Sequence, residues 1–189
     1  MTVEQGNRKA GTMSRRRLLG VGCGLAAGAL LPWRGALAYS DAKTLGFKHL
    51  HTGEELSAVF WSQGRYNEDG LAELKHIMRD WRTEQTIEID RMLYQLLFDI
   101  RNKVGTDQPF QIISAYRSPK TNLQLRQNSD GVAKKSLHMQ GMAIDVRLPG
   151  YSTKGLQQLA LKMHRGGVGY YGRSDFVHLD TGRPRSWVG

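Results

Sequence analysis

Two short stretches of the sequence carry residue types that bind metal ions. KKSLHMQGMAIDVRLPG (134–150) holds His138 and Asp145, and DFVHLD (175–180) holds His178 between two aspartates. Imidazole nitrogens and carboxylate oxygens are common zinc ligands, and three protein ligands leave one coordination position open for chemistry. Both stretches could therefore belong to a catalytic metal site, although a loop histidine and a solvated strand carboxylate would produce the same pattern.

Both stretches include a predicted β-strand, in which alternate side chains point to opposite faces of the sheet. In MAIDVR (142–147) the three apolar residues Met, Ile and Val share one face, so Asp145 lies on the other. In FVHLD (176–180), His178 and Asp180 lie opposite the valine and the leucine. Neighbouring strands would present Asp145 and His178 to one groove, and Gly141 would let the chain turn His138 toward them. Two imidazoles and one carboxylate would then hold Zn²⁺.

The rest of the sequence predicts helices and strands that do not alternate as regular βαβ units. Apolar residues at helical spacing indicate helices, and period-two alternation indicates strands. The expected helices cover 68–82, 89–105, 118–127 and 152–165, and the expected strands lie in a hairpin at 47–61 and at 110–116, 142–148 and 166–180. We therefore expect a single α+β domain over residues 39–189, with a mostly antiparallel sheet flanked by helices.

Residues 1–38 have the order of an export signal. Arg15 and Arg16 precede an apolar run at 18–32, and ALA (36–38) supplies the small residues that a signal peptidase needs. The arginine pair resembles the twin-arginine signal. The apolar run is shorter than the roughly 20 residues of a membrane span. We therefore expect cleavage after Ala38, no stable membrane anchor and a periplasmic location.

The cysteine content excludes a disulfide in the mature chain, and the net charge indicates the kind of partner that it binds. The one cysteine, Cys23, lies within the predicted signal, so the mature chain cannot depend on a disulfide. Residues 39–189 carry 21 of the 27 basic and 16 of the 17 acidic residues, a net charge of +5. This mild excess suits an anionic partner such as the cell wall. Export and the lack of a basic-aromatic motif argue against nucleic acid as the partner.

Three motifs, in the same order along the chain, resemble a known group of zinc peptidases. SLHMQGMAID (136–145) fits the pattern SxHxxGxAxD of the lysostaphin, D-alanyl-D-alanine metallopeptidase and hedgehog types. SAYRS (114–118) is similar to their arginine motif, and DFVH (175–178) to their acid-x-x-His ending. HTGE, GVAKKS, GGVGYY and FVHLDTG further resemble the YcbK-like murein endopeptidase family. This likeness covers nearly all of residues 39–189 and implies a fold of the hedgehog and D-Ala-D-Ala-peptidase kind.

The resemblance implies a role for four of the candidate residues. His138, Asp145 and His178 match the zinc ligands of the group. Arg117 matches the arginine that steadies the substrate carbonyl while negative charge develops on its oxygen. In this scheme a water activated by the zinc is the nucleophile, and no catalytic serine or cysteine is needed.

The sequence offers two candidates for the general base. Asp175 lies three residues before His178, where the group carries a glutamate or an aspartate base. Strand parity places Asp175 on the face opposite His178, whereas Asp180 shares the face of His178. We predict Asp175 as the base, because a turn or bulge at the start of a strand breaks parity. Asp180 would then orient a metal ligand.

The resemblance implies a zinc-dependent endopeptidase that hydrolyses peptide cross-links of peptidoglycan. Two alternatives stay open from the sequence: a D,D-carboxypeptidase on the same scaffold, and a zinc-binding or wall-binding module without turnover. Lys134 and Lys135 precede His138 and could bind a carboxylate of a stem peptide. An ordinary pair of solvated lysines fits the sequence equally well.

Overall fold

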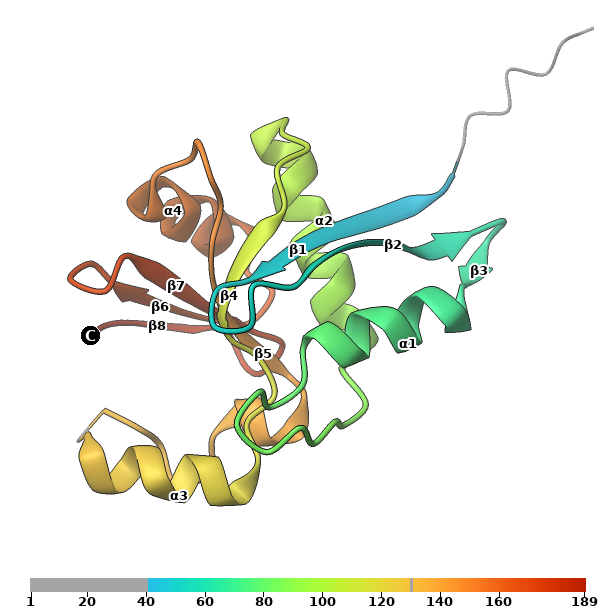
Figure 1. The fold of residues 1–189 in the computed structure, drawn as a ribbon. Coiled ribbons are helices and arrows are strands. Elements are labelled where there is room, and N and C mark those ends of the chain that lie inside the picture. Colours follow the sequence, from blue (N-terminus) through green and yellow to red (C-terminus); the bar gives the residue numbers. More distant parts are fainter. Residues whose placement is uncertain (1–40, 130) are drawn as a thin grey trace, which may run out of the picture. The chain divides into compact units, whose positions relative to one another are not determined.

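The computed structural model describes residues 41–129 and 131–189, which form an eight-stranded sheet with helices (Figure 1). The strand order is β3-β2-β1-β4-β5-β7-β6-β8. The strands are β1 (Lys43–His49), β2 (Glu55–Ser62), β3 (Arg65–Tyr66), β4 (Phe110–Ser114), β5 (Ala143–Arg147), β6 (Gly167–Tyr171), β7 (Phe176–Asp180) and β8 (Arg185–Val188). The predicted signal lies outside the described residues. Within the described part, no helix is both long enough and apolar enough to span a membrane.

The prediction of an α+β fold with a mostly antiparallel sheet is confirmed. Five of the strand pairs are antiparallel, including the hairpin β1–β2 and the central pair β5–β7. Two pairs are parallel, β1 with β4 and β6 with β8. The helices are α1 (Glu68–Ile77), α2 (Arg91–Val104), α3 (Pro119–Asn128) and α4 (Thr153–Met163), with one 3₁₀ turn, η1 (Leu137–Gln140).

The hydrophobic core lies on one face of the sheet. Residues of α1, α2 and α4 join the strands in this core, whereas α3 buries only Thr121 and Asn122 and lies apart from the other α-helices (Figure 1). In β5, Ile144 and Val146 are fully buried in the core, so Asp145 points to the other face. The sheet therefore keeps one face for packing and leaves the other for the candidate site.

The first predicted helix ends earlier than the sequence pattern indicates, at Ile77. The chain turns there, and the buried carboxylate of Asp80 accepts hydrogen bonds from the backbone N–H groups of Arg82 at 3.1 Å and Ser118 at 2.9 Å. A buried carboxylate is costly unless it accepts hydrogen bonds, and the turn supplies these two N–H donors. The turn is therefore more stable here than a continued helix. The same bonds fix the start of α3 and, next to it, Arg117.

The sheet continues beyond the strands predicted at 166–180, because β8 pairs with β6. Half-buried and exposed residues alternate along this four-residue strand, so its sequence has little apolar pattern. Trp187 of β8 lies against Gly169, where an added Cβ would stand 2.5 Å from the indole ring. Gly169 therefore provides the space that brings Trp187 next to the candidate site.

Candidate active site

His138 lies in η1, a single turn that directs its side chain back toward the sheet. The hydroxyl of Ser136 caps this turn and accepts a hydrogen bond from the His138 backbone N–H at 3.4 Å. Gly141 ends the turn with a left-handed backbone, φ 68°. A Cβ at this position would stand 2.3 Å from the carbonyl oxygen of Glu88. Only glycine fits this close approach without strain. The turn that it ends holds the side chain of His138 in a buried position.

Asp145 and His178 face each other across two adjacent strands. Strands β5 and β7 are antiparallel, and Asp145 is the register partner of His178. Directly opposed residues of an antiparallel pair have Cβ atoms about 4.5–5.5 Å apart, so their side chains can meet. Both side chains are buried, on the face of the sheet opposite the core. The structure thus brings together the two residues that strand parity assigns to one groove.

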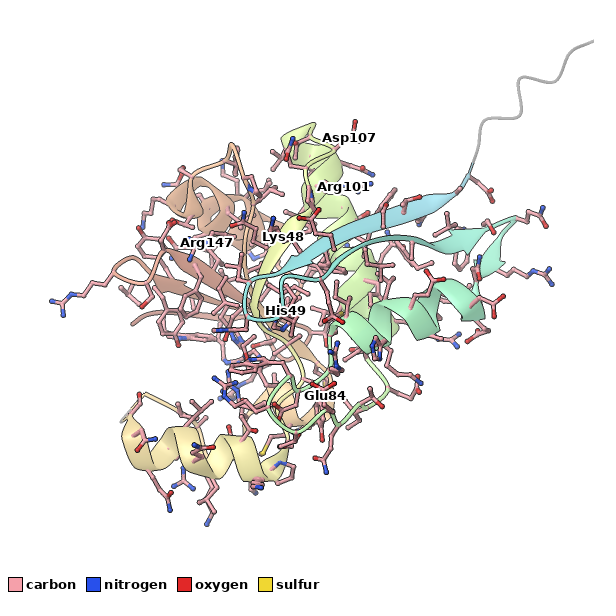
Figure 2. The ribbon with its side chains drawn as sticks, in the orientation of Figure 1. Lys48, His49, Glu84, Arg101, Asp107 and Arg147 are labelled. Atoms are coloured by element: carbon pink, nitrogen blue, oxygen red, sulfur yellow. The ribbon has the colours of Figure 1, made fainter. Side chains whose placement is uncertain are left out.

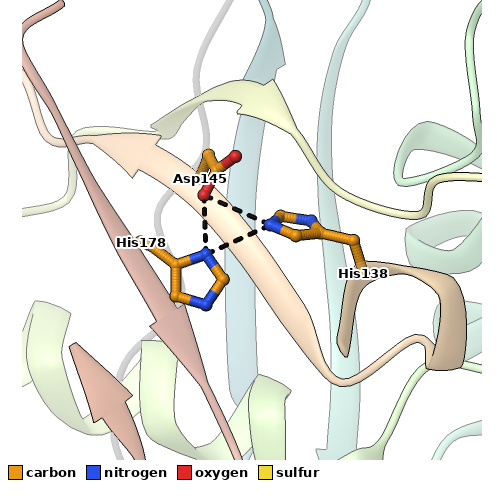
Figure 3. Close-up of side chains that lie close together, drawn as sticks. All are labelled: His138, Asp145 and His178. Carbon is orange, nitrogen blue, oxygen red and sulfur yellow. Dashed lines mark hydrogen bonds and ion pairs between the residues drawn. The ribbon is translucent and has the colours of Figure 1, made fainter. Parts of the chain in front are cut away.

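One atom from each of the three side chains converges on the same point (Figure 3). Nδ1 of His178 lies 2.9 Å from Oδ1 of Asp145 and 3.1 Å from Nε2 of His138. Nε2 of His138 lies 3.3 Å from the same oxygen of Asp145. Ligand atoms of a four-coordinate zinc, with bonds of about 2.0–2.1 Å, stand about 3.3 Å apart. The spacing and the donor set therefore fit a zinc ion held by three protein ligands.

The second ring nitrogen of each histidine is fixed by an acceptor behind it. Nδ1 of His138 donates to the carbonyl oxygen of Ala115 at 2.7 Å. Nε2 of His178 donates to Oδ2 of Asp180 at 2.9 Å. Such bonds set the tautomer and the orientation of a ligating imidazole. They leave Nε2 of His138 and Nδ1 of His178, the two converging atoms, free to bind a metal.

Asp180 is fully buried and has a donor on each oxygen. It accepts hydrogen bonds from the backbone N–H groups of Gly167 and Gly182, both at 2.9 Å, and two from Arg185, at 2.6 and 3.0 Å. Burial raises the pKa of Asp180, but the hydrogen bonds from His178 and Arg185 outweigh burial and hold the pKa well below its usual range. Asp180 therefore stays ionised and orients His178.

In the metal-free protein the three candidate ligands carry one proton beyond those of two neutral imidazoles. Burial lowers the pKa of His138, and the attraction of Asp145 offsets this only in part. Burial also lowers the pKa of His178, but its hydrogen bonds to Asp145 and Asp180 outweigh burial and raise the pKa to about 9. Burial raises the pKa of Asp145, yet the two imidazoles hold it well below its usual range. At neutral pH the proton therefore lies on His178.

Arg117 lies directly beside the three ligand residues. Its Nη2 donates to Oδ2 of Asp145 at 3.3 Å and to the hydroxyl of Ser114 at 3.1 Å. Its backbone N–H donates to the carbonyl oxygen of His138 at 3.2 Å. Its Nε is buried and has no hydrogen-bond partner among the described residues. The guanidinium is thus held at the site by Asp145 and Ser114.

A cleft of about 450 Å³ opens over these residues. Residues 129, 131–133 and 135–137, between α3 and His138, form one part of its lining. Another part consists of Tyr171, Phe176 and Trp187. The rings of Tyr171 and Phe176 stack with centroids 4.5 Å apart, and the indole N–H of Trp187 donates to the Tyr171 hydroxyl at 3.0 Å. An extended chain can therefore reach the three ligand residues along a partly aromatic surface.

Asp175 is the one predicted site residue that does not contact the others. It precedes β7 with a left-handed backbone, φ 52°, and its carboxylate accepts a hydrogen bond from Thr153 at 2.9 Å. The other oxygen pairs at 3.4 Å with Arg147, which is labelled in Figure 2. Arg147 shares the face of β5 that carries Asp145, whereas Thr153 begins α4, whose residues join the core on the other face. Asp175 is not among the described residues that line the cleft.

Sequence reasoning missed three contributors to the site, namely Arg185, Trp187 and the carbonyl of Ala115. Arg185 and Trp187 lie two residues apart on β8, so both face the cleft. The only sequence signal for them is an arginine and an aromatic residue at strand spacing shortly after FVHLD. A backbone carbonyl carries no sequence signal, so the partner of His138 Nδ1 is visible only in the folded chain.

Comparison with known proteins identifies the family. A family model described as Peptidoglycan L,D-endopeptidase MepK matches residues 38–187. The chain belongs to this family. The MepK relative of Escherichia coli K12, named peptidoglycan L,D-endopeptidase, is 42% identical over 177 residues, which are 92% of this chain and 97% of the relative. A probable peptidoglycan L,D-endopeptidase MepK of Haemophilus influenzae is 36% identical over 180 residues, 93% of this chain and 96% of the relative. The motif-based assignment to the YcbK-like murein endopeptidase family, the family of these MepK relatives, is confirmed.

Zinc affinity should rise with pH, because the metal must displace the proton of His178. The pKa of that imidazole is about 9 in the metal-free protein. Between about pH 6 and pH 9 we expect the apparent dissociation constant to fall by up to roughly tenfold per pH unit. Isothermal titration of the metal-free protein with zinc, in buffers of different ionisation enthalpy, measures both the affinity and the proton release.

Two histidine variants supply the controls for this titration. His138→Ala removes a ligand atom and should weaken zinc binding by more than about 100-fold, beyond the range typical of outer-sphere changes. His76→Ala changes an exposed histidine of α1 and should leave the affinity unchanged. An affinity that is independent of pH, or equal losses in the two variants, would contradict this account of the site.

Proposed function

We propose that the chain is a zinc-dependent endopeptidase that hydrolyses peptide cross-links of peptidoglycan. The observation that carries the proposal is the convergence of His138, Asp145 and His178 beside Arg117 in an open cleft. The names of the E. coli and H. influenzae relatives supply the substrate and the type of cleavage. A buried arginine and an accessible cleft at the ligands support turnover over a role in metal or wall binding alone.

In the proposed mechanism the residues of the chain bind the substrate and move protons. Zinc on the three ligands would supply a Lewis acid that activates water and polarises the scissile carbonyl. Arg117 would donate a hydrogen bond to the carbonyl oxygen as negative charge develops there. Its contact with Asp145 positions it for this role. Asp180 would hold the His178 ring in place throughout.

Asp175 is proposed as the general base, which takes a proton from the attacking water and gives it to the leaving amine. Asp180 is poorly suited, because both of its oxygens are occupied by donors and its pKa lies far below its usual range. It also contacts Nε2 of His178, on the side of the ring away from the ligand atom. Asp175 has an exposed carboxylate and directly precedes Phe176, which lines the cleft.

We further propose that the mature protein, residues 39–189, acts in the periplasm after export by a twin-arginine signal in residues 1–38. The arginine pair, the apolar run and the small residues at 36–38 support this proposal. The peptidoglycan named for the relatives lies outside the cytoplasm, which is consistent with export.

The endopeptidase proposal predicts that the purified protein converts cross-linked muropeptide dimers to monomers. The activity should disappear with a chelator, because the three ligands alone supply no Lewis acid, and should return when zinc is added. Chromatography of the digest with mass spectrometry measures the products. Intact dimers in the presence of bound zinc would refute the enzymatic role. Release of terminal D-alanine alone would instead indicate the carboxypeptidase.

If Asp175 is the general base, Asp175→Asn should impair turnover, whereas Asp180→Asn should impair zinc binding. Asp175→Asn should lower kcat by about 10²–10⁴-fold, the usual contribution of a general base, without changing zinc affinity. Asp180→Asn should weaken zinc binding by roughly 10–100-fold, because it disturbs the support of a ligand. Its activity should recover in part when zinc is saturating. Full activity of the Asp175 variant, measured with saturating zinc, would exclude Asp175 as the base.

A further inference from the structure

The charged side chains that line the cleft are mostly cations. Among the described residues, Arg117, Lys135 and Arg185 contribute positive charge and Asp145 contributes negative charge. Arg117 pairs with Asp145, and Arg185 pairs with Asp180. Lys135 forms no ion pair with any described residue. A zinc ion at the three ligands would add further positive charge, so the cleft favours an anionic group on whatever it binds.

Lys135 lines the cleft that opens over the candidate ligands, and its side chain is exposed. The next residue, Ser136, is buried and caps the turn that carries His138. Lys135 is therefore three residues from a metal ligand, on a segment whose following residues are anchored. Lys134, its neighbour, is equally exposed but does not line the cleft. The two lysines that the sequence could not distinguish thus have different surroundings in the fold.

We propose that Lys135 is a specificity-determining residue that binds a free carboxylate of the substrate peptide close to the scissile bond. This inference rests on the proposed function and specifies its substrate class, namely acidic peptides rather than their amidated counterparts. The ammonium group is a compact charge with three donors on a flexible stem, which suits a carboxylate whose position varies among peptides. Because the contact is exposed to solvent, salt should weaken it.

The test compares Lys135→Ala with the matched control Lys134→Ala in the full zinc-loaded chain. Two cross-linked peptide dimers serve as substrates, one with a free carboxylate on the residue beside the scissile bond and one with that carboxylate amidated. For the acidic dimer, Lys135→Ala should raise KM by about tenfold, the effect of losing a hydrogen bond between charged groups. It should leave kcat and the KM of the amidated dimer unchanged. Lys134→Ala should leave all of these values unchanged.

Isothermal titration of the two product peptides, acidic and amidated, measures the same preference without turnover. Tighter binding of the acidic peptide, lost in Lys135→Ala and reduced by salt, would support the carboxylate subsite even if no dimer were cleaved. That combination would refute the endopeptidase proposal alone. Cleavage of both dimers with equal KM changes in the two lysine variants would refute the subsite and leave the endopeptidase proposal standing.

Discussion

The backbone pairing of β5 with β7 is the constraint on which the site depends. Its register places Asp145 opposite His178 and Ala143 opposite Asp180. A slip of one residue would turn these polar side chains into the core. The fully buried neighbour Ile144 prevents that slip, because it occupies the core on the other face. The hydrophobic core therefore fixes the position of two candidate metal ligands and of the carboxylate that supports one of them.

Pairing of opposite charges offsets the free-energy cost of burying this cluster. Isolated buried charges are costly, so each must be matched by a partner. Asp145 is matched by Arg117 and by the proton on His178, and Asp180 is matched by Arg185 and two backbone N–H groups. A bound cation can replace the shared proton without leaving either carboxylate unpaired. Folding stability and metal binding therefore depend on the same ion pairs and hydrogen bonds.

The part of the site that depends on local pattern could be predicted from the sequence. Strand periodicity assigned Asp145 and His178 to one face, and the motif around His138 and Gly141 identified the turn. Contacts between distant segments could not be predicted. The support of Asp180 by Arg185 requires β8 to pair with β6, which no periodicity in that short strand indicates. The first helix likewise ends earlier than its helical spacing predicts. Asp80, which follows it, accepts a hydrogen bond from the backbone N–H of the distant residue Ser118.

The central claim is that His138, Asp145 and His178 hold one zinc ion. X-ray absorption at the zinc edge tests it directly, on the protein loaded with one equivalent of zinc. We predict a four-coordinate shell of nitrogen and oxygen at about 2.0–2.1 Å with scattering from two imidazoles. In His178→Ala the scattering of one imidazole should be lost. A six-coordinate oxygen shell, or two imidazoles that persist in His178→Ala, would contradict the account.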